Sequence, residues 1–387
     1  MKVRFQNWFN RLFPQPVLLP VGIYHYQSPP EQEKQYRLHL RIEKDGSGLL
    51  IINASTVLHL NQTAAEYAYY MINGESEETI SKKISTRYQI KRENAASDYH
   101  TFEENLSTLI STPDLAPETF FGYNRVDPYS QSVSAPYRLD CAITYKTEES
   151  VPNTVTPQDR VTRELITSEW ETILSKAWQA GIPHVIFTGG EPTLRPDLPE
   201  LVQIAERLGM VSGVLTDGLR LSDTHYLHQL LQSGLDHVMI VFDPGDSQSV
   251  EAIRDVIAED IHLTVHFTLS SAWDKKAFEI IDQLHKLGVT TLSLSVPKAS
   301  LKQRMQEVRD YAVSLGLQLV WDLPVPYSIA NPVSLELSDS GVEPSKAAGK
   351  AWLYVEPDGD VRPEQGDPAL LGNLLTDTWE DVWSKVS

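Results

Sequence analysis

Between residues 137 and 322 the chain alternates short apolar runs with longer segments of helical periodicity, and this alternation restricts the fold most strongly. Seven of the runs have the composition of buried strands, and every gap between them has an amphipathic helical pattern. The strands are predicted at residues 137–145, 184–188, 212–215, 237–242, 263–269, 290–296 and 317–322. Because strands that alternate with helices pair in parallel, the pattern predicts an α/β fold built on a parallel sheet.

Glycines mark the ends of the predicted helices. Gly181, Gly209, Gly234, Gly288 and Gly316 each follow an apolar-periodic stretch and precede a predicted strand. A left-handed residue at that place ends a helix, and glycine adopts this conformation without steric cost. Six strand–helix units followed by a seventh strand predict a partial (β/α)6-type barrel over residues 137–330, since eight units need more chain than remains.

A smaller domain is predicted before the barrel, at residues 35–110. The run GLLIINASTVLHLN supplies two strand-like stretches, and two helical stretches follow it, which indicates a winged-helix-like module. The first helix is expected to open with a capping box of Thr63 and Glu66 and to end at Gly74. Ser76 is the expected N-cap of the second helix.

Three further segments complete the predicted organisation. Residues 1–34 form an N-terminal amphipathic segment, with Phe5, Trp8, Phe9, Leu12 and Phe13 at helical spacing beside basic residues. Docking on its own domain is favoured for this segment over a membrane surface. Residues 111–136 contain four prolines and follow neither period, which predicts a linker. Residues 331–387 form an extension with a hairpin turn at Pro357-Asp358-Gly359 and a last helix at 376–386.

Charge and cysteine content exclude several functions. The 52 acidic residues exceed the 33 lysines and arginines and give a net charge of −19, which opposes binding to nucleic acid. Cys141 is the single cysteine, so the chain has neither an intrachain disulfide nor a set of thiolate metal ligands. No apolar run approaches the roughly 20 residues that cross a bilayer, so we expect a cytoplasmic protein without a transmembrane segment.

The most informative motif is Gly189-Gly190-Glu191-Pro192, directly after a predicted strand. It lies at the carboxyl end of a parallel sheet, where ligands of such folds bind; the glycines let backbone approach a ligand, and Glu191 can accept hydrogen bonds from an ammonium group. The segment resembles the Gly-Gly-Glu-Pro motif of radical-SAM enzymes, whose loop binds the amino group of S-adenosylmethionine. Thr216-Asp217-Gly218 is similar to the Thr-Asn-Gly that ends the family's third strand. The resemblance implies an S-adenosylmethionine pocket, vestigial or retained, at Gly189, Gly190, Glu191, Pro192, Thr216 and Asp217.

The chain departs from the family where the catalytic cluster is held. Family members have three cysteines after the first barrel strand, and their thiolates hold a [4Fe–4S] cluster. The corresponding positions here are Thr147, Val151 and Thr154, none of which replaces a thiolate. A register that uses Cys141 puts Tyr145 and Glu148 at the other two positions. No iron–sulfur cluster is therefore expected, and Cys141 is interpreted as a small core residue.

The flanking regions resemble two further modules of peptide maturases. The C-terminal extension is similar to SPASM or twitch extensions, but Glu364 follows Pro363 where the family has a cysteine, and Ala347 or Ala348 stands near the earlier one. Residues 35–110 resemble PqqD-like peptide-recognition domains, in which a leader peptide adds a strand to a sheet edge. A generic winged helix stays open as an alternative for this unit.

Three functions follow from these expectations. The favoured one is a non-catalytic, peptide-binding or scaffolding component of a RiPP-type peptide-modification system. Its partner is a leader or substrate peptide, and a cluster-bearing radical-SAM paralogue is left open as a second partner. The alternatives are a cluster-independent enzyme that retains S-adenosylmethionine or a nucleotide in the barrel mouth, and a plain peptide- or protein-binding module. No metal is assigned to the pairs His225/His228 and His262/His266, because each lacks a third ligand.

Overall fold

The structure, a computed structural model, describes residues 18–29, 31–32, 34–112, 133–321, 323–338 and 347–386. The chain divides into two compact units, residues 1–130 and 131–387. The predicted aromatic residues of the N-terminal segment and most of the predicted linker lie outside the described residues. No helix in the described ranges is long and apolar enough to cross a lipid bilayer.

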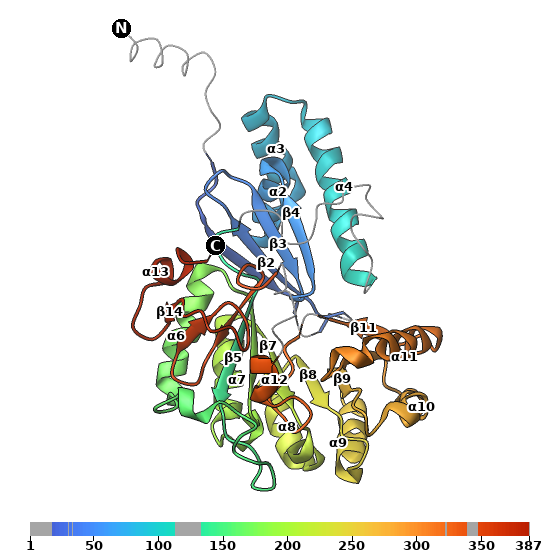
Figure 1. Cartoon of the computed structure of the whole chain (residues 1–387). Helices are drawn as coiled ribbons and strands as arrows, with labels where there is room; N and C mark the ends of the chain where they lie inside the picture. Colours follow the sequence, from blue (N-terminus) through green and yellow to red (C-terminus); the bar gives the residue numbers. More distant parts are fainter. Residues whose placement is uncertain are drawn as a thin grey trace. The chain divides into compact units, whose positions relative to one another are not determined.

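The first unit is an antiparallel sheet followed by helices (Figure 1). Its strands are β1 (Gly22–Gln27), β2 (Arg37–Ile42), β3 (Gly48–Ile52) and β4 (Thr56–Leu60), in the order β1-β2-β3-β4. Its helices are α2 (Gln62–Ile72), α3 (Glu77–Tyr88) and α4 (Arg92–Ser111). Alternate strand residues such as Leu40 and Leu50 are fully buried with Ala65 and Ala68 of α2, so α2 covers one face of the sheet.

Two details of the first unit differ from the predictions. Strand β1 pairs along its whole length with β2, so the sheet begins at Gly22, and a boundary at residue 35 is too late. The N-cap of α2 is Asn61, whose side chain accepts a hydrogen bond from the Ala64 amide at 2.9 Å. Glu66 is instead 2% exposed and pairs with Arg87 of α3, so the predicted capping box does not form. Gly74, at φ +72°, and the cap Ser76 are as predicted.

The second unit is a ten-stranded sheet in the order β11-β10-β9-β8-β7-β6-β5-β12-β13-β14. Its parallel strands are β5 (Arg138–Thr144), β6 (His184–Gly189), β7 (Val211–Thr216), β8 (His237–Val241), β9 (His262–Thr268), β10 (Thr291–Ser295) and β11 (Gln318–Val320). They coincide with the seven predicted strands to within two residues at every end. The five glycines predicted to end helices all have positive φ.

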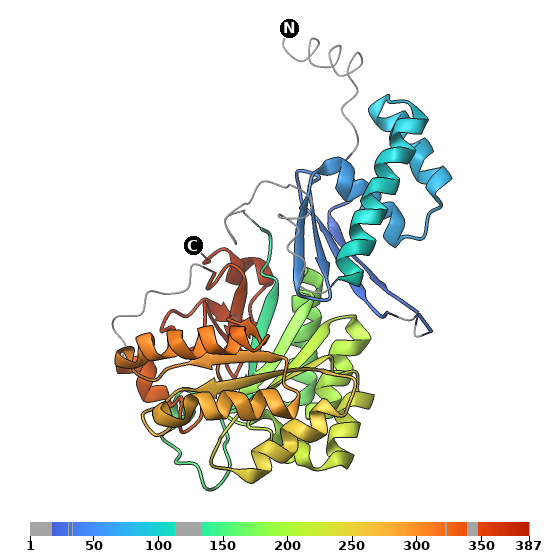
Figure 2. The ribbon, with the colours of Figure 1, turned by 90° about the vertical axis from the view of Figure 1, so that its right-hand side faces the viewer.

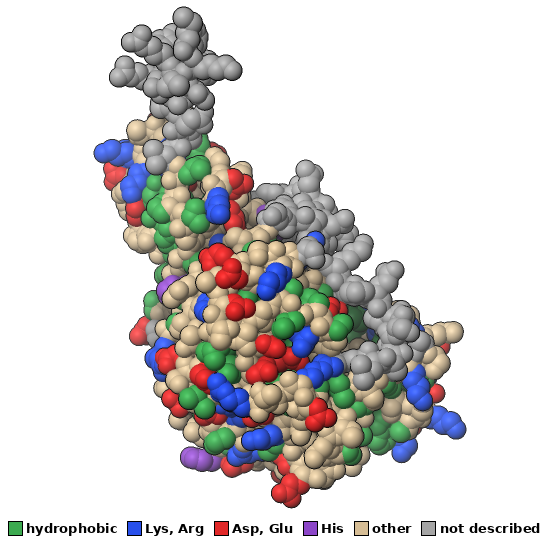
Figure 3. Space-filling view, turned by 60° about the vertical axis from the view of Figure 1, so that its left-hand side comes forward, with side chains coloured by type: hydrophobic (Ala, Val, Ile, Leu, Met, Phe, Trp, Pro, Cys, Tyr) green, Lys and Arg blue, Asp and Glu red, His purple; other side chains and the backbone are tan. Residues whose placement is uncertain are grey.

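Helices pack on the outer face of this sheet, which curves as an open barrel (Figure 2). They are α6 (Thr167–Ala180), α7 (Leu198–Leu208), α8 (Thr224–Gln232), α9 (Ser247–Ile257), α10 (Ala277–Leu287) and α11 (Lys302–Ser314). The fold is therefore the predicted α/β partial barrel. Acidic and basic side chains are interspersed over the part of its surface seen in Figure 3.

The C-terminal segment extends the barrel sheet. Strand β12 (Trp352–Val355) pairs in parallel with β5, and β13 (Asp360–Arg362) and β14 (Gly372–Asn373) follow in antiparallel order. The predicted hairpin is confirmed between β12 and β13. The short helix α12 (Val333–Ser338) precedes the hairpin, and the last helix, α13 (Trp379–Trp383), is shorter than predicted.

The inner face of the barrel has an unusual pair of histidines. His184 of β6 and His237 of β8 bring their Nε2 atoms to 2.8 Å across Gly213 of β7. A Cβ atom at Gly213 would lie 2.1 Å from Cε1 of His237, so a side chain there displaces the imidazole. Burial lowers the pKa of His237 to about 3, so the ring is neutral and one imidazole donates to the other.

The substitution Gly213→Ala is expected to lower the free energy of unfolding by about 1–3 kcal/mol, because the added methyl group overpacks this contact. Urea denaturation of the full chain measures the loss. In a His237→Ala background the same substitution should cost much less, because the ring that it meets is absent. Equal costs in the two backgrounds would contradict this explanation of the glycine.

Candidate functional site

The Gly-Gly-Glu turn after β6 is held against the chain that follows β5. The amide of Gly190 donates to the Thr144 carbonyl and the amide of Glu191 to the Lys146 carbonyl, both at 2.8 Å. A Cβ atom at Gly189 (φ +133°) would lie 2.0 Å from the Thr144 oxygen, and one at Gly190 would lie 2.2 Å from the Lys146 oxygen. The two glycines therefore make room for the protein's own backbone, whereas the sequence interpretation gave that room to a ligand.

The carboxylate of Glu191 joins this turn to the end of β7. It is 3% exposed, and its Oε1 atom accepts from the Thr193 amide at 2.9 Å and from the hydroxyls of Thr193 and Thr216 at 2.5 and 2.7 Å. Its Oε2 atom accepts from the Asp217 amide at 2.8 Å. Burial raises the pKa of Glu191, and these hydrogen bonds oppose that rise. The carboxylate is thus engaged by four donors of the chain itself.

Asp217 lies beside this carboxylate and titrates abnormally. Burial, together with the Glu191 charge, raises the pKa of Asp217 from its ordinary value of 3.8 to about 8. At neutral pH its carboxyl group is mostly protonated and can donate a hydrogen bond to Glu191. The resembled family has a neutral asparagine at this position, and a protonated aspartic acid is likewise an uncharged donor.

The structure brings together five of the six predicted pocket residues, Gly189, Gly190, Glu191, Thr216 and Asp217, through the contacts above. Pro192 is buried and begins a short 3-10 helix, η2 (Pro192–Leu194). Arg195, which follows this short helix, was assigned no role from the sequence. Its Nη1 atom donates to the carbonyls of Ile143 and Leu165, both at 2.9 Å. The Nε and Nη2 atoms of the same guanidinium group pair with the carboxylate of Asp197. Arg195 therefore fixes the chain around β5 from the outer side of the turn.

The three positions that correspond to cluster ligands do not form a metal site. Val151 packs against the apolar cluster that contains Tyr145 and Val155, while Thr147 is half-buried and Thr154 is exposed. One alkyl group and two neutral hydroxyls do not fit an iron–sulfur cluster, which takes thiolates. Cys141 is fully buried in the outer-face core, and burial raises the pKa of its thiol well above the usual value. A thiol in that state is unreactive.

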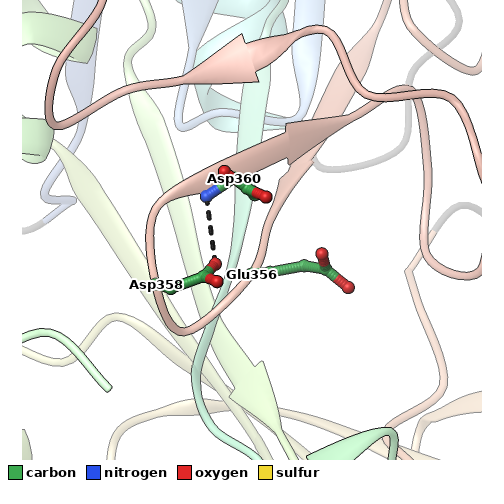
Figure 4. Close-up of side chains that lie close together, drawn as sticks. All are labelled: Glu356, Asp358 and Asp360. Atoms are coloured by element: carbon green, nitrogen blue, oxygen red, sulfur yellow. Dashed lines mark hydrogen bonds between the residues drawn. The ribbon is translucent and has the colours of Figure 1, made fainter. Parts of the chain in front are cut away.

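An acidic group lies on the hairpin of β12 and β13 (Figure 4). Oxygen atoms of Glu356, Asp358 and Asp360 approach within 4.8 Å of one another. The buried Glu356 accepts from the Tyr145 hydroxyl at 3.1 Å and from Arg362 Nε at 2.8 Å. Asp358 accepts from the backbone amide of Asp360, and Asp360 accepts from an Asn373 amide group. These hydrogen bonds explain why the three acidic side chains lie close together: they stabilise the turn that closes the hairpin.

The predicted histidine pairs do not converge on a common point. His228 pairs with Glu259 at 2.9 Å on the surface, and His225 is exposed. His266 is fully buried and hydrogen-bonds to the hydroxyls of Ser293 and Ser295, each at 3.0 Å. Burial lowers the pKa of His266 to about 4, so the ring is a neutral member of a hydroxyl network on the inner face.

A half-barrel of parallel strands with a Gly-Gly-Glu turn after its second strand resembles radical S-adenosylmethionine domains. Residues 141–297 match the radical SAM superfamily. The cluster positions of this chain are degenerate, because it has one cysteine in all.

Two curated relatives are similar in sequence. The PqqA peptide cyclase of Streptomyces rochei is 31% identical over 179 residues, which are 42% of this chain and 49% of that protein. The PqqA peptide cyclase of Gluconobacter oxydans (strain 621H) is 33% identical over 152 residues, which are 35% and 42% of the two chains. The matches thus span about half of these relatives or less.

A solved structure shares the fold over most of the chain. SuiB of Streptococcus suis, bound to the precursor peptide SuiA, has a TM-score of 0.59 at 15% identity and covers 89% of this chain and 86% of its own. At 15% identity, this structural similarity shows that the two proteins share a fold.

Anaerobic reconstitution with iron and sulfide is expected to leave the protein colourless, because Thr147, Val151 and Thr154 supply no thiolate. Iron analysis and the visible absorption spectrum measure this. The matched control is the variant with cysteine at all three positions, treated in parallel. Stoichiometric iron with charge-transfer absorbance in the parent protein would contradict the assignment of these positions.

The carboxyl group of Asp217 should make stability depend on pH. The folded state holds a proton between about pH 4 and pH 8 that the unfolded chain releases, so stability falls as pH rises through this window, by up to about 1.4 kcal/mol per unit. Asp217→Asn should flatten this part of the curve and be more stable than the parent at about pH 8. Urea denaturation across the window measures it, with the exposed Asp310→Asn as control. If the free energy of unfolding of Asp217→Asn falls with pH as steeply as that of the parent, Asp217 is ionised throughout this window.

Proposed function

We propose that this chain binds a peptide through its N-terminal unit and has no radical chemistry of its own, as the non-catalytic component of a peptide-modification system. The observation that carries the proposal is the combination in one chain of an open sheet edge with a barrel whose cluster positions are Thr147, Val151 and Thr154. Similarity to PqqA peptide cyclases and the fold shared with SuiB, which was solved with a precursor peptide, support a peptide as the partner.

The edge that would receive the peptide is β4. Within the described residues β4 is the last strand of its sheet and pairs with β3 alone. Its residues Leu58 and Leu60 pack toward the core on the side of α2, while Val57 and His59 point to the opposite face. A peptide strand beside β4 gains backbone hydrogen bonds from the edge and side-chain contacts on both faces, which is how strand addition achieves affinity. This mode needs no reactive side chain.

A cluster-independent enzyme is the second candidate, and one observation favours it. Glu191 and Asp217 are adjacent carboxyl groups with displaced pKa values at the carboxyl end of the sheet, as in many acid–base sites. The four donors that already engage Glu191 argue for a structural role instead. Glu191→Gln should then lower the stability of the protein without a ligand, because the amide that replaces one oxygen opposes an N–H or O–H donor.

Hydrogen exchange of the full chain tests the favoured proposal. Synthetic peptides encoded by small reading frames beside the gene supply the probes, and a binding peptide should protect amides in β4, Thr56–Leu60. Methylation of alternate backbone nitrogens in the same peptide should weaken binding about tenfold or more, because strand pairing needs those N–H groups. Protection restricted to residues 189–192 and the other strand ends of the barrel would favour the enzyme instead.

A further inference from the structure

A segment that follows the last barrel strand crosses the inner side of the barrel. We call residues 323–333 the mouth strap; their sequence is LPVPYSIANPV. Leu323 packs against Ile186, Leu215 and Met239, which are inner-face residues of β6, β7 and β8. Farther on, the strap reaches the Gly-Gly-Glu turn and the loop after β5. The strap therefore passes from the β11 edge to the other side of the open barrel, since five strands separate β11 from β5 in the sheet.

Two backbone hydrogen bonds attach the strap to the site described above. The Tyr327 amide donates to the Gly189 carbonyl at 3.2 Å, and the Val333 amide donates to the Val155 carbonyl at 2.8 Å. Gly189 belongs to the turn after β6, and Val155 follows directly on Thr154, the third degenerate cluster position. The strap thus donates hydrogen bonds to two carbonyl groups at the barrel mouth.

The side chain of Tyr327 anchors the strap. It is 3% exposed and meets the ring of Tyr145 edge-on, with the ring centroids 5.8 Å apart and an interplanar angle of 76°. Ala142, Val155 and Tyr354 complete the cluster around these rings, and Val151 packs against it. An aromatic side chain of this size gains both buried area and a favourable ring–ring geometry from such a pocket.

The rest of the strap is held more loosely. Pro326 and Tyr327 are its buried residues, the others are half-buried or exposed, and Ile329 is 69% exposed. Asn331 and Gln365 donate side-chain hydrogen bonds to the Val325 carbonyl. Pro324, Pro326 and Pro332 have no N–H to satisfy and favour an extended chain, so the strap is ordered at a low entropic cost. A segment with one deep anchor and few buried neighbours opens locally at a lower free energy than the barrel core.

We propose that the strap occupies, in cis, a peptide site in the barrel mouth that accepts an extended segment with one aromatic residue. Two of the interactions that hold the strap there, an amide to the Gly189 carbonyl and a ring in the tyrosine pocket, can be made by another extended chain. The inference deepens the proposed peptide-binding function, because it adds a second contact for the same class of partner. When the strap leaves, the site is open; when it is seated, the site is closed.

A peptide with the strap sequence, LPVPYSIANPV, is the probe for this site. Fluorescence anisotropy should show that it binds the full-length Tyr327→Ala variant at least about tenfold more tightly than the parent, because the parent's own strap competes for the pocket. The same peptide with alanine in place of tyrosine is the matched control and should bind neither protein. Equal affinity of the probe for parent and variant, or no binding to either, would overturn the proposal.

A second variant guards against misfolding of Tyr327→Ala. Val333→Pro removes the N–H that donates to Val155 and places proline at the first residue of α12, where helices accept it. It keeps the tyrosine and weakens one attachment, so probe affinity should rise above that of the parent in this variant too. Protection of β4 by a peptide is measured separately. If β4 is protected and neither variant gains affinity for the probe, the strap proposal fails and the N-terminal function stands.

Discussion

Two backbone hydrogen bonds between neighbouring loops determine how the carboxyl edge of this barrel is built. They join the turn at Gly189 and Gly190 to the chain after β5, and they form because neither glycine has a side chain to keep the carbonyls of Thr144 and Lys146 away. Any larger residue at either position would force the two loops apart. The buried carboxylate of Glu191 depends on this approach, since it is held where the donors of η2 and β7 converge on it.

The Gly-Gly-Glu turn therefore has an architectural role in this domain, whose three cluster positions are Thr147, Val151 and Thr154. Glu191 is engaged by hydrogen bonds of the chain, and Asp217 is kept mostly protonated, so the pair adds about one negative charge to the buried edge. The place of thiolates is taken by apolar packing around Tyr145, to which Val151 contributes. Each buried polar group named here has a hydrogen-bond partner within the protein.

The sequence alone predicted the fold of the barrel well, because strand and helix periods and the helix-ending glycines agree along that stretch. It failed where tertiary contacts decide. The sequence of strand β1 has a weak strand pattern, and the strand forms because β2 lies beside it. Glu66 pairs with Arg87 and therefore does not form the predicted capping box. Five of the six predicted pocket residues lie together in the structure. The chain's own donors occupy the carboxylate of Glu191, and the strap hydrogen-bonds to Gly189. Both features depend on contacts between residues far apart in the sequence, which no local motif encodes.

Calorimetric titration of the full chain with S-adenosylmethionine tests the central claim, that the barrel edge is satisfied by its own residues and not by a cofactor. The account predicts no saturable heat up to about 1 mM ligand, because Glu191 and the Gly189 carbonyl already have donors and Thr147, Val151 and Thr154 supply no thiolates for a cluster that would chelate the ligand. Binding with one site per chain and a Kd below about 100 μM would contradict it.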